Sequence, residues 1–377
     1  MTILLSHHKF AILVLLSFFT TLSHQATPPP NPRLQKAYYA LQAWKHSITS
    51  DPRGFTSDWY GPNVCNYTGV FCAPSLDDPH ITTVAGIDLN HGNISGYLPE
   101  DLGLLTDLAL FHINSNMFCE TVPKSFEKLG LLYELDISNN LFSGDFPSVV
   151  LSLPSLKFLD IRFNRFKGEV PSKLYDLKLD AIFINNNLFD ASFPKNLGNS
   201  PVSVIVFANN NIKGCLPSSI KKMAQTLNEL ILVNVSLSGC LTPEIGSLKK
   251  LTVFDVSRNS LVGMLPESIG EMKSLEQLNV AHNKFSGEIP SSICSLPKLE
   301  NFTYSYNYFS GEPKICLKLA DRDDRQNCIL ERPAQRKVTE CKAFYSRPVN
   351  CRGCGAPPPP PPPPPSPPPP KHWLPPY

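Results

Sequence analysis

The sequence lacks a hydrophobic run long enough to cross a membrane. Its one extended apolar stretch, FAILVLLSFF at residues 10–19, covers about ten residues, whereas a membrane-spanning helix needs about 20. Lys9 precedes the stretch and small residues follow it up to Ala26, which is the pattern of a secretory signal peptide over residues 1–26. We therefore expect a secreted protein with no transmembrane segment and no lipid anchor.

The sequence also lacks a charge imbalance. Its 34 lysines and arginines nearly balance its 32 aspartates and glutamates. Proteins that bind nucleic acids or anionic membranes usually carry a marked positive excess. Composition therefore gives no reason to expect a nucleic-acid partner.

Cysteines, in contrast, are frequent. Secretion brings all eleven into an oxidising compartment, where they can pair. Cys351 and Cys354 form one CxxC motif, but a finger-like zinc site needs a second pair, and a redox motif needs a thioredoxin-like setting. We therefore expect disulfides and neither a metal nor a cofactor. Because eleven is odd, one thiol stays free, with Cys119 the first candidate, or links two chains in a disulfide-bonded homodimer. The cysteines stand at positions 65, 72, 119, 215, 240, 294, 316, 328, 341, 351 and 354.

A repeat of 23 to 25 residues organises the middle of the chain. Its units end in Gly-x-x-Pro, as in NNLFSGDFP at 139–147 and HNKFSGEIP at 282–290. Such a period over about ten units indicates a leucine-rich-repeat solenoid. Each coil carries a short strand, such as YELDIS at 133–138, whose Leu135 and Ile137 should point into a shared core. The predicted fold is an α/β leucine-rich-repeat solenoid with a parallel β-sheet on its concave face.

An asparagine recurs four residues before the glycine of most units. Its buried amide can satisfy backbone groups where the chain turns, so we assign these residues a structural role and not a catalytic one. Gly92 and Val235 interrupt the series. The asparagines are those at 116, 140, 164, 187, 210, 259, 283 and 307.

Both ends of the repeat carry other patterns. Apolar residues at 34, 38, 41, 44 and 48 have helical spacing, which predicts a helical N-terminal cap. Beyond residue 311 the repeat stops and a disulfide-rich C-terminal segment begins. The expected parts are a signal peptide at 1–26, the cap at 27–79, repeats at 80–311, a cysteine-rich hinge at 312–356 and a proline-rich tail at 357–377.

Position suggests two disulfides. Cys65 and Cys72 lie close together at the start of the first coil and should pair. Cys215 and Cys240 each follow the repeat glycine on consecutive coils, where they would stack about 5 Å apart, within reach of a disulfide. Four Asn-x-Ser/Thr triplets are candidate glycosylation sites: Asn66, Asn93, Asn234 and Asn301.

Several strings resemble a known family. CNYTGVFC, GCLTPEIGSLKKLTVFDVSRNSLVGMLPESIGEMKSLEQLNVAHNKFSGEIP and CKAFYSRPVNC are similar to the amino half and hinge of plant leucine-rich repeat extensins. The similarity runs from about residue 33 to residue 354. It implies a cell-wall glycoprotein whose repeats bind small basic secreted peptides of the rapid-alkalinization-factor type. Such a protein would couple those peptides to wall assembly and growth.

The end of the chain departs from that family. Extensin tails usually carry many Ser-Pro modules with tyrosines, whereas here one SPPPP precedes a single Tyr377. Polyproline forms an extended left-handed helix, so the fourteen-residue run predicts a spacer of about 40 Å, which the family would hydroxylate at proline. A solvated linker without a partner is the open alternative.

Outward-facing strand positions predict where a ligand binds. Residues between the core positions line the concave face of such solenoids. Carboxylates towards one end and an apolar stripe after them would suit a basic peptide. The predicted peptide-binding residues are Asp88, His112, Glu134, Asp136, Phe158, Asp160, Phe183, Val206, Ile231 and Asp255, with Val204 and Glu229 in the neighbouring column.

Charge differs between the two main parts. Residues 24–311 hold 22 basic and 26 acidic side chains, and residues 312–355 hold 10 and 6. An acidic repeat region would attract basic peptides, and a basic hinge would favour pectin or other acidic wall polymers. The plainer alternative is that both sets of charges only solvate the surface.

Other functions compete with peptide binding. We do not expect an enzyme, because a smooth sheet face offers no pocket that positions a substrate and excludes water. A pectinase-inhibitor-like wall protein has the same kind of coil, and a purely structural wall component would depend on the tail alone. Both remain alternatives.

Overall fold

The computed structural model describes residues 31–347, 349 and 351. The predicted signal peptide, the proline-rich tail and Cys354 lie outside the described residues. The described chain forms two compact units. The first contains residues 31–143 and 152–156, and the second contains residues 144–151 and the described residues from 157 onward.

The first unit begins with the predicted cap helix. Helix α2 (Pro32–Ser47) starts at Asn31, whose side chain accepts a hydrogen bond from the backbone N–H of Arg33 at 2.9 Å. Proline in the first turn suits a helix start, because its missing N–H would have no partner there. The helix buries Leu41 and Trp44 against the first coils. The helical cap is therefore confirmed.

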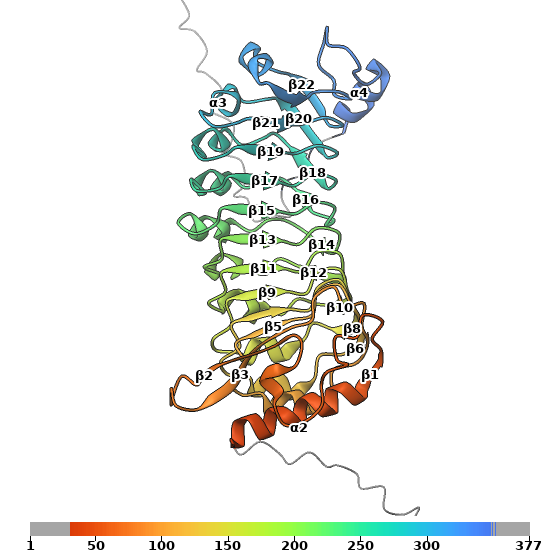
Figure 1. The fold of residues 1–377 in the computed structure, drawn as a ribbon. Coiled ribbons are helices and arrows are strands. Elements are labelled where there is room, and N and C mark those ends of the chain that lie inside the picture. Colours follow the sequence, from red (N-terminus) through yellow and green to blue (C-terminus); the bar gives the residue numbers. More distant parts are fainter. Residues whose placement is uncertain (1–30, 348, 350, 352–377) are drawn as a thin grey trace, which may run out of the picture. The chain divides into compact units, whose positions relative to one another are not determined.

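Two sheets run along the first unit (Figure 1). In the main sheet, β2 is antiparallel to β3, and β3, β5 and β7 are parallel. In the second sheet, β1 is antiparallel to β4, and β4, β6 and β8 are parallel. The elements are β1 (Ile48–Ser50), η1 (Val64–Asn66), β2 (Val70–Pro74), β3 (Thr82–Asp88), β4 (Ser95–Gly96), η2 (Glu100–Leu104), β5 (Leu110–His112), β6 (Met117–Glu120), η3 (Lys124–Lys128) and β7 (Glu134–Asp136), with β8 (Leu141–Asp145) and η4 (Ser148–Ser152) holding residues of both units.

The second unit repeats the same coil. Its main sheet is parallel from β9 to β23, and its second sheet is parallel along β10, β12 and β14 and along β16, β18, β20 and β22. The elements are β9 (Phe158–Asp160), β10 (Arg165–Gly168), η5 (Ser172–Asp176), β11 (Ala181–Phe183), β12 (Leu188–Ser192), η6 (Leu197–Asn199), β13 (Val204–Val206), β14 (Asn211–Lys213), η7 (Ser218–Met223), β15 (Glu229–Ile231), β16 (Ser238–Gly239), η8 (Pro243–Ser247), β17 (Val253–Asp255), β18 (Ser260–Gly263), η9 (Glu267–Glu271), β19 (Gln277–Asn279), β20 (Lys284–Glu288), α3 (Ser291–Cys294), β21 (Asn301–Thr303), β22 (Tyr308–Gly311), η10 (Lys314–Lys318), β23 (Asp321–Asp323) and α4 (Val338–Tyr345).

The repeat residues explain this geometry. In most coils the recurring proline stands immediately before a 3₁₀ helix, as Pro171 does with φ −62° and Pro266 with φ −61°. The proline ring holds φ near that value and so sets the entry into the turn. Inward strand residues such as Leu135 and Leu278 are fully buried. The predicted leucine-rich-repeat solenoid is confirmed.

The asparagines form the predicted internal ladder. The amide nitrogen of Asn283 donates to the carbonyl oxygens of Val256 at 2.9 Å and Val280 at 3.1 Å, and its oxygen accepts from the backbone N–H of Leu261 at 3.0 Å. These contacts cross from coil to coil in a buried setting. Asn140 makes the corresponding contacts in the first unit.

Replacing Asn283 with alanine should therefore lower the free energy of unfolding by about 3 kcal/mol, because it leaves buried backbone groups without partners. The exposed Asn228 makes no side-chain hydrogen bond in the described structure, so Asn228→Ala should cost less than about 0.5 kcal/mol. Urea denaturation of both variants measures the difference. Equal midpoints would remove the stabilising role of the ladder.

The repeat continues one coil beyond residue 311, where we expected it to stop. Strand β23 pairs in parallel with β21, and Asn327 continues the ladder by donating to the carbonyl oxygen of Tyr304 at 3.1 Å. The step from Asn307 to Asn327 is shorter than the repeat period, and no Gly-x-x-Pro follows it. The boundary predicted at 311 was therefore placed too early.

The disulfides confirm one predicted pair and correct another. Cys65 and Cys72 are bonded, with Cα atoms 5.5 Å apart. Cys240 pairs with Cys351, so the predicted Cys215–Cys240 bond is wrong, although Cys215 is also disulfide-bonded. Stacking brings neighbouring coils within reach of each other, but a hinge segment far along the chain folds back and supplies the partner. Cys294 on α3 pairs with Cys316 of the hinge, and Cys328 pairs with Cys341 within the hinge.

Cys119, the first candidate for a free thiol, forms no disulfide in the structure. It is the one unbonded cysteine in the described part of the chain. Its sulfur lies 3.4 Å from the carbonyl oxygen of Gly96 and is partly buried. That contact places the thiol against the neighbouring coil as a packed side chain.

Candidate functional site

The main sheet of the first unit brings together four predicted residues. Asp88, His112 and Asp136 are cross-strand neighbours on β3, β5 and β7. Glu134 lies on the same face of β7, and its carboxylate is 3.0 Å from Nε2 of His112. The predicted column therefore exists in this unit as a contiguous polar surface.

Most of the carboxylates on this surface are already engaged. Glu134 pairs with His112, and Asp136 accepts hydrogen bonds from the backbone N–H of Ser138 at 2.9 Å and from its hydroxyl at 2.5 Å. Asp88 is exposed and accepts one bond from the backbone N–H of Asn90. A carboxylate held by internal donors attracts a ligand less than a free one, so less negative charge faces solvent than the sequence suggested.

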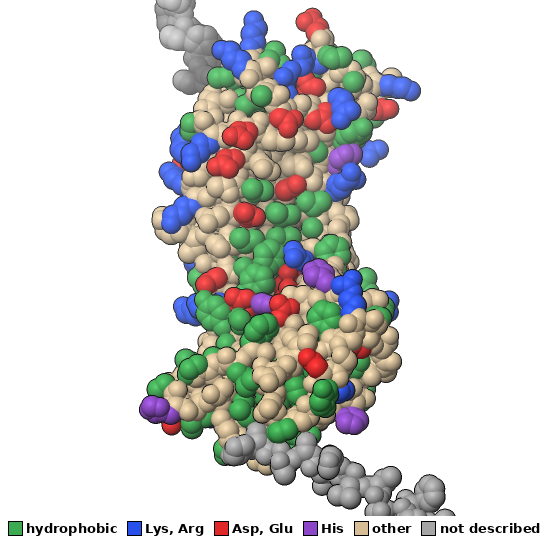
Figure 2. Space-filling view, in the orientation of Figure 1, with side chains coloured by type: hydrophobic (Ala, Val, Ile, Leu, Met, Phe, Trp, Pro, Cys, Tyr) green, Lys and Arg blue, Asp and Glu red, His purple; other side chains and the backbone are tan. Residues whose placement is uncertain are grey.

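The second unit carries the predicted apolar stripe. Phe183, Val206 and Ile231 are direct cross-strand neighbours on β11, β13 and β15, and the ring of Phe158 lies 5.5 Å from that of Phe183, centroid to centroid. Val204 flanks them in the next column. All five side chains are half-buried and face outward. Figure 2 shows the hydrophobic side chains gathered over these strands. We call these five residues the apolar stripe.

Asp160 departs from the prediction of an outward-facing carboxylate. It is only 1 % exposed, and its Oδ2 atom lies 3.0 Å from Nε of Arg162. The guanidinium of Arg162 also lies 5.4 Å from the centre of the Phe183 ring, so it covers both groups. The buried, paired carboxylate is therefore not available to a basic ligand.

Arg162 is the residue that the sequence reasoning missed. It lies on the same face two residues after the middle column, a position that Ser138, Ser257 and Ala281 fill in other coils. A single large cation in a series of small side chains was the available signal. Arg162 forms the edge of the apolar stripe beside Phe183.

Two carboxylates adjoin the other side of the stripe. Glu229 pairs in register with Val204 and has no hydrogen bond or ion pair within the described residues. Asp255 follows Ile231 in the middle column and accepts from the backbone N–H of Ser257 and from Asn279 at 3.0 Å. The stripe therefore has an apolar centre with acidic groups beside it.

The predicted sequons differ in exposure. Asn66, Asn93 and Asn234 are exposed, whereas Asn301 is partly buried on β21. The amide of Asn301 donates a hydrogen bond to Asp321 at 2.7 Å. This hydrogen bond would have to break before a glycan could attach. The amide of Asn234 also donates, to the side-chain oxygen of Asn209 at 3.0 Å, so Asn66 and Asn93 are the two exposed sites without such a bond in the described structure.

The described residues contain neither a metal-binding cluster nor a membrane-spanning helix. Within residues 31–347, no three or more histidine, cysteine or acidic side chains are grouped so as to hold a metal ion. Within the same range, every helix is too short or too polar to pass through a bilayer.

Comparisons with known proteins agree with this architecture. A family model of the leucine rich repeat N-terminal domain matches residues 34–73, and the Leucine Rich Repeat model matches residues 155–177, 250–272 and 274–296. Among solved structures, the chain is similar to the Arabidopsis receptor kinase HAESA in complex with the peptide hormone IDA and a co-receptor. The TM-score is 0.70 at 27% identity, over 78% of this chain and 50% of that one. The plant peptide hormone receptor RGFR1 in complex with RGF2 gives a TM-score of 0.60 at 26% identity, over 65% and 40%.

Curated relatives share far more sequence. Leucine-rich repeat extensin-like protein 6 of Arabidopsis thaliana is 69% identical over 339 residues, which are 89% of this chain and 72% of that protein. Extensin-like protein 4 of the same plant is 63% identical over 86% of this chain and 66% of its own length. For extensin-like protein 3, 63% identical, the chain spans only 42% of the relative. The chain belongs to the leucine-rich repeat extensin-like family.

Proposed function

We propose that this chain is an extracellular cell-wall protein that binds a small basic secreted peptide on the main sheet of its second unit. The observation that carries this proposal is the apolar stripe with Glu229 and Asp255 beside it. An exposed contiguous apolar surface on a folded protein usually marks a partner site. Carboxylates beside it would favour a positively charged partner and speed its encounter.

The comparisons support the same class of ligand. Two solved structures with the same fold, those of HAESA and RGFR1, contain a bound peptide hormone. The extensin-like names of the relatives support a wall location, and the disulfides suit an oxidising compartment. The ligand we propose is a basic peptide of the rapid-alkalinization-factor type, the class that the family resemblance implies. The protein acts by binding, without catalysis of its own.

Calorimetry of the secreted protein against a panel of such peptides tests the proposal. The double variant Phe183→Ala with Glu229→Lys removes the central ring of the stripe and reverses the adjoining charge. Loss of one well-packed aromatic anchor costs about 2 kcal/mol or more, so affinity should fall at least about 30-fold.

The matched control is Tyr60→Ala with Glu271→Lys, which removes an exposed ring and reverses an exposed carboxylate elsewhere. Tyr60 is 74 % exposed and lies on the cap, and Glu271 lies on a 3₁₀ helix. The control should bind peptide like the unaltered protein. Equal losses in both variants, or no binding by well-folded protein to any peptide in the panel, would reject the proposal in favour of an inhibitor or structural role.

A further inference from the structure

A second groove lies on the other sheet of the second unit, beside the hinge. We call residues 338–347, 349 and 351 the strap. It contains helix α4 and is fixed by two disulfides, Cys328–Cys341 at one end and Cys240–Cys351 at the other. Between the strap and strands β16 to β22 is a groove of about 680 Å³. Its lining includes Ser260, Val262, Lys284, Tyr308, Phe344 and Arg347.

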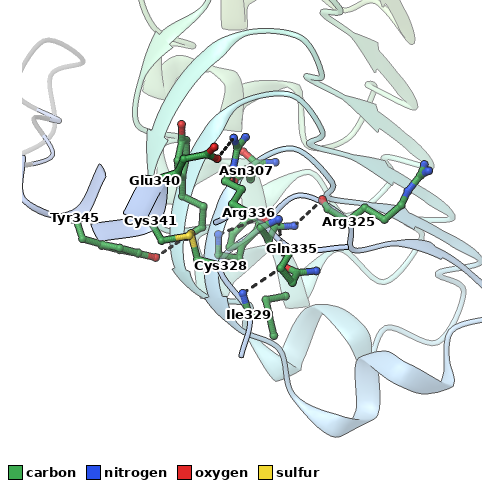
Figure 3. The surroundings of a disulfide bond; sticks show 12 residues. Asn307, Arg325, Cys328, Ile329, Gln335, Arg336, Glu340, Cys341 and Tyr345 are labelled. Carbon is green, nitrogen blue, oxygen red and sulfur yellow. Dashed lines mark hydrogen bonds and ion pairs between the residues drawn. A yellow bond between two sulfur atoms is a disulfide. The ribbon is translucent and has the colours of Figure 1, made fainter. Parts of the chain in front are cut away.

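Flat rings form one wall of this groove. The rings of Tyr308 on β22 and Phe344 on α4 are nearly parallel, with centroids 3.7 Å apart. The guanidinium of Arg336 lies 4.3 Å from the centre of the Tyr308 ring, and its Nε donates to the carbonyl oxygen of Asn307 at 2.7 Å. Figure 3 shows Arg336 extending from the hinge between Asn307 and Glu340. These contacts hold the wall rigidly against the last coils.

The groove is basic. Lys284 and Arg347 are exposed and form no ion pair within the described residues. Glu340 is the one acidic residue of the lining, and it lies 3.9 Å from Arg336. An uncompensated pair of cations in a concave, partly apolar site concentrates anionic ligands.

A cationic and aromatic edge extends the groove. Arg258 and His282 occupy the same position on consecutive coils, two residues before Ser260 and Lys284. The ring of His282 stacks on that of Tyr306 at 4.2 Å, and Arg258 is exposed without an ion pair in the described chain. His282 also faces Arg336 and Asp323, and Arg325 already holds that carboxylate through two bonds of 2.8 Å. The edge therefore adds positive charge and flat ring surface.

We propose that the groove and its edge bind an acidic oligosaccharide, that is, a chain of uronic acid residues. The apolar face of a sugar ring packs on the accessible apolar side chains of the lining, Phe344 and Val349. Its carboxylate pairs with lysine and arginine, and its hydroxyl groups bond to small polar groups such as Ser260. Successive coils lie about 4.8 Å apart, so cations on neighbouring coils can meet successive carboxylates of an extended polymer. An acidic peptide would satisfy the cations, but it has no row of hydroxyl groups to bond to the small polar groups of the lining, Ser238 and Ser260. This site lies on the second sheet and does not depend on the proposed peptide site.

The test measures binding of oligogalacturonate of about ten residues to the secreted full chain at two salt concentrations. Arg258→Glu with Lys284→Glu should weaken binding at least about ten-fold, because two charge-assisted contacts become repulsive. The matched control, Lys250→Glu with Lys298→Glu, makes the same change in net charge at two exposed lysines elsewhere in this unit and should alter binding less than about two-fold.

Two further probes identify the ligand class. Fully methyl-esterified oligogalacturonate has no free carboxylates and should bind at least about ten-fold more weakly than the free acid, because its charge-assisted contacts are lost. Polyglutamate of equal length should bind more weakly than oligogalacturonate. Equal binding of polyglutamate, equal loss in the control variant, or no binding of oligogalacturonate would each overturn the proposal. Peptide calorimetry on the same variants should be unchanged, which keeps this result separate from the proposed function.

Discussion

Replacing Trp44 with alanine is expected to lower the free energy of unfolding of the first unit by about 3–5 kcal/mol. Trp44 is fully buried on helix α2. Its ring lies 5.7 Å from that of Trp59, 5.6 Å from that of Phe111 and 5.7 Å from that of Phe118. One side chain therefore joins the cap helix, the segment after it and the first coils. Its loss would leave a cavity that three rigid rings cannot close.

The fluorescence of Trp59 reports this transition, because it remains in the variant and lies in the same cluster. Tyr39→Ala is the matched control, since Tyr39 is an aromatic residue of the same helix that is 51 % exposed. It should change the free energy of unfolding by less than about 0.5 kcal/mol. If the two variants unfolded at the same denaturant concentration, the cap would not depend on this cluster.

The sequence predicted the coil because periodicity records burial. Leu135, Ile137 and the ladder asparagines repeat at a fixed step, and the structure buries them as that step requires. The cap helix was predictable for the same reason. The last coil was not predicted from the sequence, because it is shorter than the repeat period and lacks the recurring proline. Its ladder residue Asn327 nevertheless makes the same kind of contact as Asn307. Periodicity thus finds regular coils and misses an irregular one at the end.

The candidate site was predictable in position but not in charge. The two-residue alternation of strands fixed which side chains face outward, and Phe183, Val206 and Ile231 lie where it placed them. The alternation gave no information on a long side chain, such as Arg162, that lies two residues after a predicted site residue and folds back over it. Arg162 therefore buried Asp160 without a sequence signal strong enough to foresee it. Strand alternation follows from the local sequence, whereas contacts between side chains depend on the tertiary structure around them.

The hinge pairing illustrates the same limit over a longer distance. Coil spacing placed Cys215 and Cys240 near one another, and that spacing is compatible with a disulfide. Coil spacing contained no information about the strap, which folds back and brings Cys351 to Cys240, 111 residues earlier in the chain. A pairing between distant segments follows from the path of the chain and not from local period.

Removing this bond, by Cys240→Ser with Cys351→Ser, should destabilise the second unit by about 5 kcal/mol, because the bond closes a loop of 111 residues. The matched pair Cys65→Ser with Cys72→Ser opens a loop of only 7 residues in the first unit and should cost about 2.5 kcal/mol. Hydrogen exchange at the buried amide of Phe254 on β17 and at that of Phe111 on β5 measures the two units separately.

The same variants test the strap itself. Without Cys240–Cys351, one end of the strap is released, so oligogalacturonate binding in the second groove should weaken while peptide binding on the main sheet persists.

Peptide mapping of the unreduced protein provides the control on connectivity. A fragment joining Cys215 to Cys240 would contradict the pairing, and an unchanged exchange rate at Phe254 would mean that the coils hold together without help from the hinge.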